Sequence, residues 1–148
     1  MTDQPTVSVL MPVRDGASTI GGALRSLLAQ TLGDFEVLVL DDGSRDGSAG
    51  LAAAIDDRRI RVLGDGGCRG LSYRLNRGID LARGRYIARM DADDLCFPER
   101  LARQFRYLED HPGIDLVGCR AVVFRDRGDL VGLFPFAESH EEICARPW

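Results

Sequence analysis

The fold class follows from one stretch of the chain, Phe35-Glu36-Val37-Leu38-Val39-Leu40-Asp41-Asp42-Gly43-Ser44. Its first six residues are almost all apolar, without the alternation of apolar and polar residues that marks a strand with one wet face. Such a run is typical of a strand in a sheet that helices cover on both faces. The acids, the glycine and the serine that follow end the strand. We therefore expect a buried strand at 35–40 with polar residues at its carboxyl end.

Strand-like and helix-like segments alternate on both sides of this stretch. Further strands are expected at 6–11, 60–63, 86–90, 116–124 and 130–134, and helices at 18–29, 48–55, 71–82 and from 98 onward. Pro12 is expected to end the first strand, and Ser18 to cap the first helix. The buried stripe of the third helix is expected to consist of Leu71, Leu75, Ile79 and Ala82. This alternation predicts an α/β domain with a mainly parallel sheet.

The length and composition fit one globular domain over residues 1–148. Hydrophobic residues make up 45% of the chain and charged residues 28%, which is an ordinary soluble composition. The net charge of −4 argues against a nucleic-acid binder held by phosphate contacts. All 19 basic residues are Arg, so functions that need a Lys, such as a Walker phosphate loop or a Schiff base, are excluded.

Targeting signals and cysteine pairs are not evident in the sequence. The N-terminus lacks the basic and apolar regions of a signal peptide, and no apolar run approaches the ~18 residues of a transmembrane helix. We interpret the cysteines as free thiols of a reduced cytosol, because no two form a C-x-x-C pair. They are Cys68, Cys96, Cys119 and Cys144.

Polar residues gather at the carboxyl ends of three expected strands. They form the segments Pro12-Val13-Arg14-Asp15, Asp41-Asp42-Gly43-Ser44 and Asp91-Ala92-Asp93-Asp94. In open parallel sheets, ligands bind beyond the carboxyl ends of the strands. Mg²⁺ and Mn²⁺ prefer oxygen ligands, usually one or two carboxylates together with substrate phosphates. The acids after 86–90 therefore predict a site for a metal and a diphosphate.

The order of these segments resembles the family 2 glycosyltransferases, which have the GT-A fold. Four blocks carry the resemblance, at 7–13, 27–31, 35–48 and 75–94, and 97–101 follows the family as well. The likeness is strong over about residues 5 to 110. It implies a three-layer α/β/α GT-A domain with a mainly parallel sheet.

The resemblance also implies a donor site for a nucleotide-diphosphate sugar. Its expected residues are Pro12, Val13, Arg14, Asp15, Asp41, Asp42, Arg74, Asp91 and Ala92. Asp91-Ala92-Asp93 resembles the family's D-x-D motif, in which Asp93 would coordinate a divalent Mn or Mg ion and Asp91 would face the ribose and the metal. Asp42 would accept an N–H of the nucleobase, and Arg74 would approach the diphosphate.

Two features depart from the family pattern. Arg14 and Asp15 stand where the family commonly has Tyr-Asn, and an Arg–Asp pair is a candidate replacement for the stacking Tyr. Family catalytic domains are normally longer than this chain, and the acceptor-side general base comes from their later part. We assign no base, because the nearby acids Glu138, Glu141 and Glu142 match no family motif, and we interpret the chain as truncated at its C-terminus.

The resemblance implies an inverting, metal-dependent transfer of a sugar to an acceptor hydroxyl. The expected setting is bacterial polysaccharide or cell-surface glycan synthesis, in the cytoplasm or peripheral at the inner membrane. The expected donor is a UDP-sugar by default, and the acceptor is a glycan or a lipid-linked molecule.

Three alternative functions lack residues that they need, and a fourth stays open. A calcium loop beginning at Asp42 lacks its bidentate ligand, because Ala53 holds the twelfth position. A dinucleotide fingerprint at 64–69 fails because Arg69 replaces the third glycine. A sugar-phosphate nucleotidyltransferase would need a glycine-rich loop directly after the first strand and a Lys, and the sequence has neither. A non-catalytic module that binds nucleotide sugars stays open.

Overall fold

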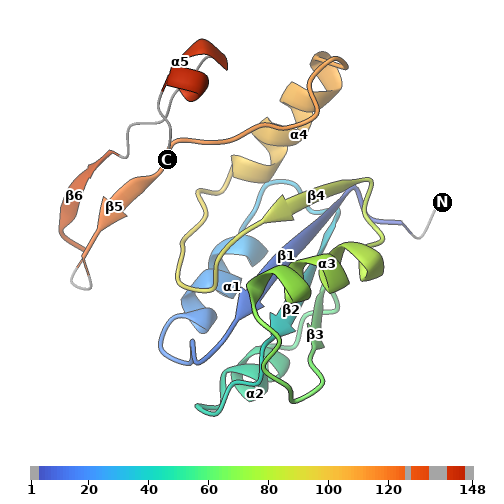
Figure 1. Ribbon diagram of the computed structural model, residues 1–148, viewed down its shortest axis with the longest axis vertical. Helices are drawn as coiled ribbons and strands as arrows, with labels where there is room; N and C mark the ends of the chain where they lie inside the picture. The colour runs from blue at the N-terminus through green and yellow to red at the C-terminus, as the bar shows by residue number, and fades with distance from the viewer. Residues whose placement is uncertain (1–3, 126–127, 134–139, 146–148) are drawn as a thin grey trace.

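The computed structural model describes residues 4–125, 128–133 and 140–145. It contains a four-stranded parallel sheet in the order β3-β2-β1-β4 with helices on both faces (Figure 1). The strands of this sheet are β1 (Val7–Val13), β2 (Phe35–Asp41), β3 (Ile60–Leu63) and β4 (Tyr86–Arg89). The helices connected to it are α1 (Ile20–Leu28), α2 (Ser48–Ala53), α3 (Leu71–Leu81) and α4 (Arg100–Asp110).

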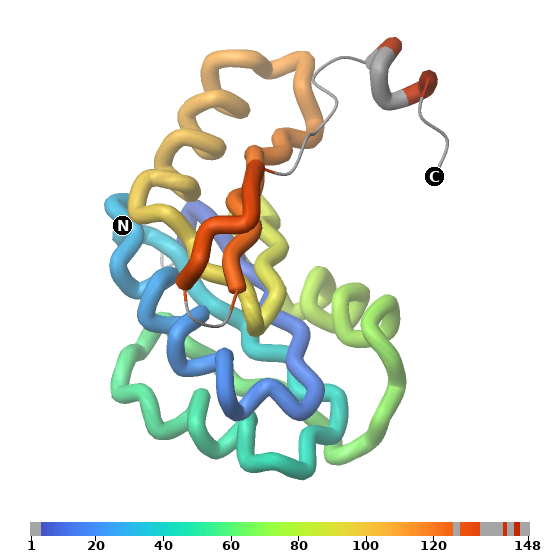
Figure 2. Tube along the Cα trace, turned by 90° about the vertical axis from the view of Figure 1, so that its left-hand side faces the viewer, coloured from blue at the N-terminus to red at the C-terminus, as the bar shows by residue number. Residues whose placement is uncertain are grey.

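A hairpin and a short helix follow the sheet. Strands β5 (Val122–Phe124) and β6 (Leu130–Leu133) pair antiparallel and form a sheet of their own, which stands apart from the four-stranded one in Figure 1. Figure 2 shows the two strands side by side as orange-red segments. Helix α5 spans His140–Ala145. The sequence predicted a strand in each of these two segments but did not predict α5.

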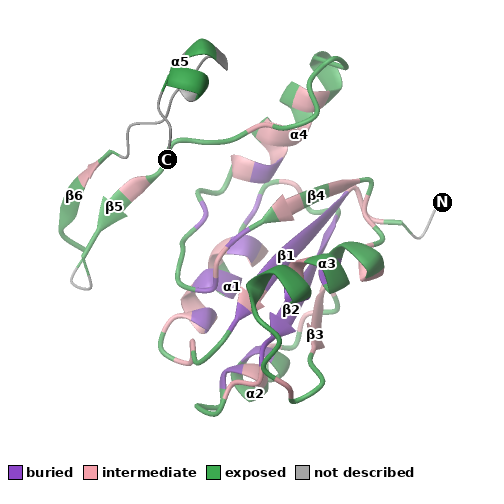
Figure 3. Ribbon diagram, in the orientation of Figure 1, coloured by how far each residue is buried: buried purple, intermediate pink, exposed green. Residues whose placement is uncertain are grey.

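The buried strand expected from the opening stretch is confirmed. Every residue of β2 is buried, and β2 pairs in parallel with β1 along seven positions, from Val7 opposite Phe35 to Val13 opposite Asp41. Figure 3 shows the two strands as a continuous buried band between the helices. An uninterrupted apolar strand needs cover on both faces, and the helix layers supply it.

Successive side chains of β1 and β2 point to opposite faces and form two separate cores. On one face, Val9, Met11, Val37 and Val39 pack with buried residues of α1, α2 and α4. On the other face, Leu10, Leu38 and Leu40 pack against α3. The α/β/α layering and the mainly parallel sheet are therefore as predicted.

The predicted end of the first strand at Pro12 is wrong. Strand β1 continues to Val13, with Pro12 in register with Leu40 of β2. The carbonyl of Leu10 accepts the N–H of Met90 on the β4 side, and that of Val13 accepts the N–H of Asp42 on the β2 side. By alternation, the nitrogen of Pro12 faces the β4 side beyond the end of β4. The missing N–H therefore costs no ladder hydrogen bond.

The predicted stripe of α3 is wrong in two of its members. Leu71 and Ile79 are 49% and 54% exposed, whereas Arg74 and Gly78 are the buried residues of the helix. Leu75, Leu81 and Ala82 flank that face and pack on the leucines of the sheet. The helix keeps the expected 3.6-residue period, but its central contacts come from an arginine and a glycine.

Two smaller predictions also need correction. Thr19, not Ser18, is the residue that precedes α1, and its side chain makes no capping hydrogen bond. The strand expected at 116–124 is only three residues long, from Val122 to Phe124, because the chain before it is irregular. Phe134 and Glu138 lie outside the described residues.

A buried ionic cluster ties the amino end of the sheet to the turn between α3 and β4. Glu36 of β2 is 2% exposed and accepts hydrogen bonds from Ser8, Arg61 and Arg83. Burial would raise the pKa of Glu36, but these hydrogen bonds, with Arg83 foremost, outweigh it and lower the pKa to about 2. The carboxylate is therefore ionised and compensated throughout the physiological range.

Glu36→Gln should lower the stability of the fold at neutral pH by about 3 kcal/mol. Since the folded-state pKa lies below the unfolded one, this stabilisation is full above about pH 4.5 and is lost as the pH falls toward about 2. Urea unfolding at several pH values should show a shallower acid loss of stability in the variant. Glu99→Gln, at an exposed pair with Arg103, is the control, and parallel pH curves for wild type and Glu36→Gln would contradict the assignment.

Gly84→Ala should destabilise the fold by about 2 kcal/mol or more. A Cβ at Gly84 would lie 2.4 Å from the backbone nitrogen of Ser8, so the turn that leads into β4 would have to move away from β1. Gly33→Ala is the matched control, because a Cβ there meets nothing within 4 Å, and its stability should stay within about 0.5 kcal/mol of wild type. Equal denaturation midpoints for the two variants would refute this close approach.

Candidate donor-binding site

A cavity of about 590 Å³ opens at the carboxyl edge of the four-stranded sheet. The predicted site residues that line it are Pro12, Val13, Arg14, Asp15, Asp42, Arg74, Asp91, Ala92 and Asp93. The three polar strand ends recognised in the sequence thus meet at one place. The cavity also has lining residues that the sequence reasoning did not select, namely Gly16, Ser18, Thr19, Gly70, Leu71 and Arg89.

Asp41 is the predicted residue that does not line the cavity. Its carboxylate accepts the backbone N–H groups of Gly43 and Ser44 at 3.2–3.3 Å. Gly43 has a φ of +75°, and a Cβ there would lie 3.2 Å from the backbone of Gly67. Asp41 therefore stabilises the turn after β2, a role that Asp commonly has in such turns.

Asp42 holds the loop that precedes α3. Its carboxylate accepts the N–H groups of Arg69 and Gly70 at 2.6 Å and 3.0 Å and the Nε–H of Arg74 at 2.9 Å. These hydrogen bonds, that of Arg69 first, lower the pKa of Asp42 to about 2. The side chain is therefore a buried anion with most of its acceptor positions in use.

Arg74 connects the same loop at a second point. Its side chain is 6% exposed, and besides Asp42 its Nη2 donates to Asp65 at 2.6 Å and to the carbonyl of Gly67. Two carboxylates thus compensate one buried guanidinium, as a buried charge requires. Arg74 lines the cavity, but its N–H groups donate to Asp42, Asp65 and Gly67. Its role is therefore to hold loop 64–70 in place as a wall of the cavity.

The turn after β1 is tied to the turn after β2. Asp15 has a φ of 53°, and its carboxylate accepts the N–H of Arg45 at 2.8 Å while its own N–H donates to Ser44. Arg14 lies 4.0 Å from Asp15, and both side chains are exposed. The Arg–Asp pair considered from the sequence is present, with the Asp fixing the backbone and the Arg at the cavity.

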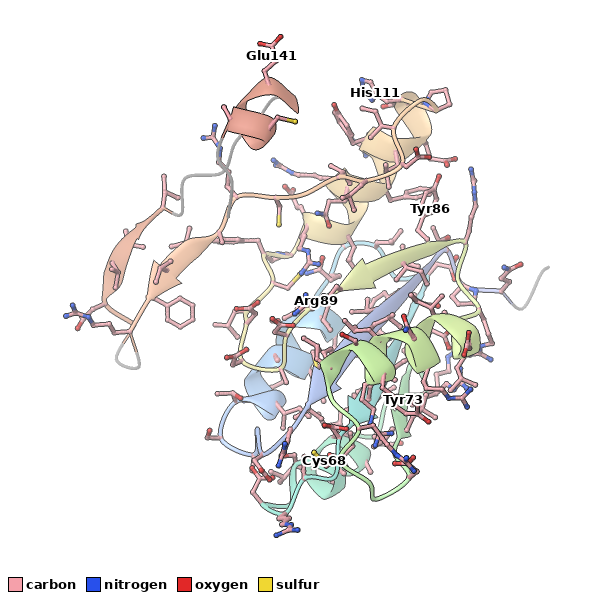
Figure 4. All side chains as sticks on the ribbon, viewed as in Figure 1. Cys68, Tyr73, Tyr86, Arg89, His111 and Glu141 are labelled. Atoms are coloured by element: carbon pink, nitrogen blue, oxygen red, sulfur yellow. The ribbon has the colours of Figure 1, made fainter. Side chains whose placement is uncertain are left out.

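The D-x-D segment presents two unlike carboxylates. Arg89, at the end of β4 (Figure 4), donates to Asp91 from Nε at 3.1 Å and from Nη2 at 2.9 Å and 3.1 Å. Asp93 is exposed, and no described residue donates a hydrogen bond to it. Burial, with the nearby charges of Asp93 and Asp91 next in size, raises the pKa of Asp94. The segment therefore concentrates negative charge at the cavity.

The carboxylates of the D-x-D segment suit a divalent cation that arrives with phosphate ligands. Within the described part of the chain, no three His, Cys, Asp or Glu side chains are arranged to hold a metal by themselves. One or two carboxylates at a cavity wall are typical of Mg²⁺ and Mn²⁺ sites that a substrate diphosphate completes. Asp93 and Asp91 are the residues that would hold such an ion.

The cavity residues missed by the sequence reasoning have different origins. Gly70 and Leu71 line the cavity because the contact of Asp42 with Gly70 and Arg74 holds the start of α3 against the end of β2. These residues are about 30 positions apart in the sequence. Arg89 carried a usable signal, because it stands two positions before Asp91 at the end of an expected strand. In an extended chain, residues two apart point to the same face.

Comparison with known proteins places the chain in a family. The family model of glycosyl transferase family 2 matches residues 8–137, and the chain belongs to this family. It is 36% identical over 131 residues to the putative glycosyltransferase EpsE of Bacillus subtilis, covering 86% of this chain and 47% of EpsE. It is 42% identical over 99 residues to the succinoglycan biosynthesis protein ExoO of Rhizobium meliloti, covering 67% of this chain and 28% of ExoO.

Solved structures share the fold. The mannosyltransferase PcManGT of Pyrobaculum calidifontis, solved with GDP-Man and Mn²⁺, matches with a TM-score of 0.64 and 29% identity over 74% of this chain and 34% of its own. Staphylococcus aureus TarS with UDP-GlcNAc matches with a TM-score of 0.68 and 24% identity, over 72% of this chain and 32% of the TarS chain. The predicted GT-A fold is confirmed, and the chain spans half or less of the length of these relatives.

Arg74→Lys should loosen loop 64–70 without unfolding the sheet. Lys keeps the charge but lacks the planar fork that reaches Asp42, Asp65 and Gly67 together. Hydrogen exchange at the amides of Arg69 and Gly70 should become at least about tenfold faster, since Asp42, which accepts both N–H groups, loses the Nε–H of Arg74 that helps to fix it.

Arg77→Lys is the control for that experiment, because Arg77 lies on the same helix with an exposed side chain that reaches only Asp80, at 3.5 Å. Its loop amides should exchange at the wild-type rate. Unchanged exchange in Arg74→Lys would mean that the loop does not depend on this arginine.

Proposed function

We propose that this chain is the donor-binding part of a glycosyltransferase that moves a sugar from a nucleotide-diphosphate sugar to an acceptor hydroxyl. The observation that carries the proposal is the meeting of three strand-end segments around one cavity, with Asp93 and Asp91 on its wall, in a member of glycosyl transferase family 2.

The cavity has distinct regions for the parts of such a donor. Pro12 and Asp42 lie at the ends of the paired strands β1 and β2, where we place the nucleoside. Arg14 and Arg89 add exposed guanidinium groups to the wall, and these suit a diphosphate. We place the diphosphate between them and the D-x-D carboxylates, with the sugar toward the open side.

The metal would be held by Asp93, with Asp91 beside it. When bound, a divalent Mn or Mg ion supplies Lewis-acid stabilisation of the charge on the departing nucleoside diphosphate. The protein's own part is to orient the donor through its strand-end residues and to hold Asp42 as an anion through the hydrogen bonds that lower its pKa. For inverting transfer the acceptor hydroxyl also needs a general base, and we assign that role to no described residue.

Names of similar proteins support the finer proposal. ExoO is a succinoglycan biosynthesis protein, which supports a role in bacterial polysaccharide or cell-surface glycan synthesis with a glycan or lipid-linked acceptor. TarS was solved with UDP-GlcNAc and PcManGT with GDP-Man, and we keep a UDP-sugar as the default donor. No helix in the described ranges is long and apolar enough to span a membrane. We propose a location in the cytoplasm or at the inner membrane surface.

A second candidate is a non-catalytic module that binds nucleotide sugars. It is favoured by one observation, the lack of an assignable general base among the described residues that face the cavity. Both candidates require the same donor site, so binding is tested first and turnover second.

Wild-type protein should bind UDP, GDP or dTDP in calorimetry, and Mn²⁺ should strengthen that binding. Asp93→Asn should weaken the Mn²⁺-dependent binding by at least about tenfold, because it removes a charged metal ligand. Asp80→Asn, on the exposed side of α3, is the control with the same charge change. The proposal is wrong if none of the three nucleotides binds, or if Asp93→Asn binds as wild type does.

A further inference from the structure

The interaction between Arg89 and Asp91 is the most specific feature of the cavity that the proposed function leaves unexplained. Arg89 contacts both oxygens of Asp91 through Nε and Nη2, at 2.9–3.1 Å. Both residues line the cavity. A two-point contact of this kind fixes the plane of the carboxylate as well as its charge. Asp91 is thus held by a protein cation at the place where a metal is expected.

The backbone of Arg89 is fixed while its side chain is accessible. Arg89 lies in register with Leu10, its carbonyl accepts Nη2 of Arg100 at 2.7 Å, and the next N–H donates to Leu10. Its side chain is 52% exposed. The guanidinium can therefore exchange partners without a movement of the strand.

The other described cations near the cavity have partners other than Asp91, and the exposed Arg14 lies 4.0 Å from Asp15. Arg74 serves Asp42 and Asp65, and Arg100 serves the carbonyl of Arg89 and Gln104. Arg89 is consequently the described cation that compensates Asp91 directly. Without it, Asp91 would stand uncompensated beside Asp93 and Asp94, an arrangement that attracts a free divalent cation.

We propose that Arg89 is a positioning residue that occupies Asp91 until the donor arrives, so that the metal and the nucleoside diphosphate bind together rather than the metal first. The inference rests on the proposed function. A metal ion at Asp91 competes with the guanidinium for the same carboxylate, and two cations on one carboxylate repel each other. A bound diphosphate reduces this repulsion, because its anionic oxygens can contact both the metal ion and the guanidinium of Arg89.

The proposal makes a thermodynamic prediction. The factor by which Mn²⁺ strengthens UDP binding must equal the factor by which UDP strengthens Mn²⁺ binding. Arg89 raises this factor in two ways, by weakening Mn²⁺ binding to the free protein and by contacting the diphosphate in the complex. Arg89→Gln removes both contributions.

The test measures UDP binding by calorimetry with and without Mn²⁺, and Mn²⁺ binding alone by electron paramagnetic resonance of the free ion. Arg89→Gln should bind Mn²⁺ alone more tightly than wild type, and the coupling factor should fall by at least about fivefold. Arg89→Lys should retain part of the coupling, since Lys keeps the charge without the fork. A merely structural role would not strengthen Mn²⁺ binding.

Arg85→Gln is the control for the charge change, because Arg85 is an exposed arginine that pairs with Glu109 and precedes β4, at the end away from the cavity. It should leave both quantities at wild-type values, and thermal melts verify that all variants fold. If wild-type protein binds no nucleotide, the proposed function fails. If it binds UDP with Mn²⁺ but Arg89→Gln and Arg89→Lys leave the coupling factor unchanged, only the role of Arg89 is overturned.

Discussion

The in-register parallel pairing of β1 with β2 is the constraint on which the rest of the structure depends. The two strands match from Val7 opposite Phe35 to Val13 opposite Asp41. The N–H of Asp42 then donates to the carbonyl of Val13, which continues the ladder by one more bond. Because both strands end at the same level, their polar ends emerge together. A slip of one residue would turn the apolar side chains of β2 to the wrong faces and separate these ends.

Two buried acids, Glu36 within β2 and Asp42 directly after it, use similar chemistry for different purposes. Glu36 binds Arg61 and Arg83 near the amino end of the sheet and fixes the turn that leads into β4. Asp42 follows the carboxyl end and, with Arg74, draws loop 64–70 and the start of α3 to the cavity. One cluster therefore positions the strand that carries the D-x-D segment, and the other builds the opposite wall. Both put charge where the sheet ends, and the centre of the sheet stays apolar.

Much of the fold could be predicted from local patterns. The uninterrupted apolar run at 35–40 identified the central strand, and three acidic strand ends identified the edge with the cavity. The misplaced stripe of α3 shows a limit of such patterns. Arg74 and Gly78 occupy the buried face with the correct helical period, but neither is apolar. Arg74 is buried because two carboxylates compensate it, and Gly78 because a Cβ there would lie 2.7 Å from Leu40.

The candidate site was predictable in position but not in its internal pairings. The sequence brought Asp42 and Arg74 to the same edge and assigned both to the ligand. Their mutual contact depends on loop 64–70, whose path no spacing rule determines. In the same way, the D-x-D resemblance indicated Asp91 and Asp93 but not the guanidinium of Arg89. Contacts of this kind depend on side-chain geometry across turns, which composition and periodicity do not encode.

A crystal structure with UDP and Mn²⁺, with anomalous data collected to locate the metal, tests the central claim most directly. The account predicts one Mn²⁺ peak in the cavity, bound by Asp93 and by diphosphate oxygens, with the nucleoside at the paired ends of β1 and β2. A metal and nucleotide bound elsewhere on the molecule, with Asp93 contacting neither, would contradict it.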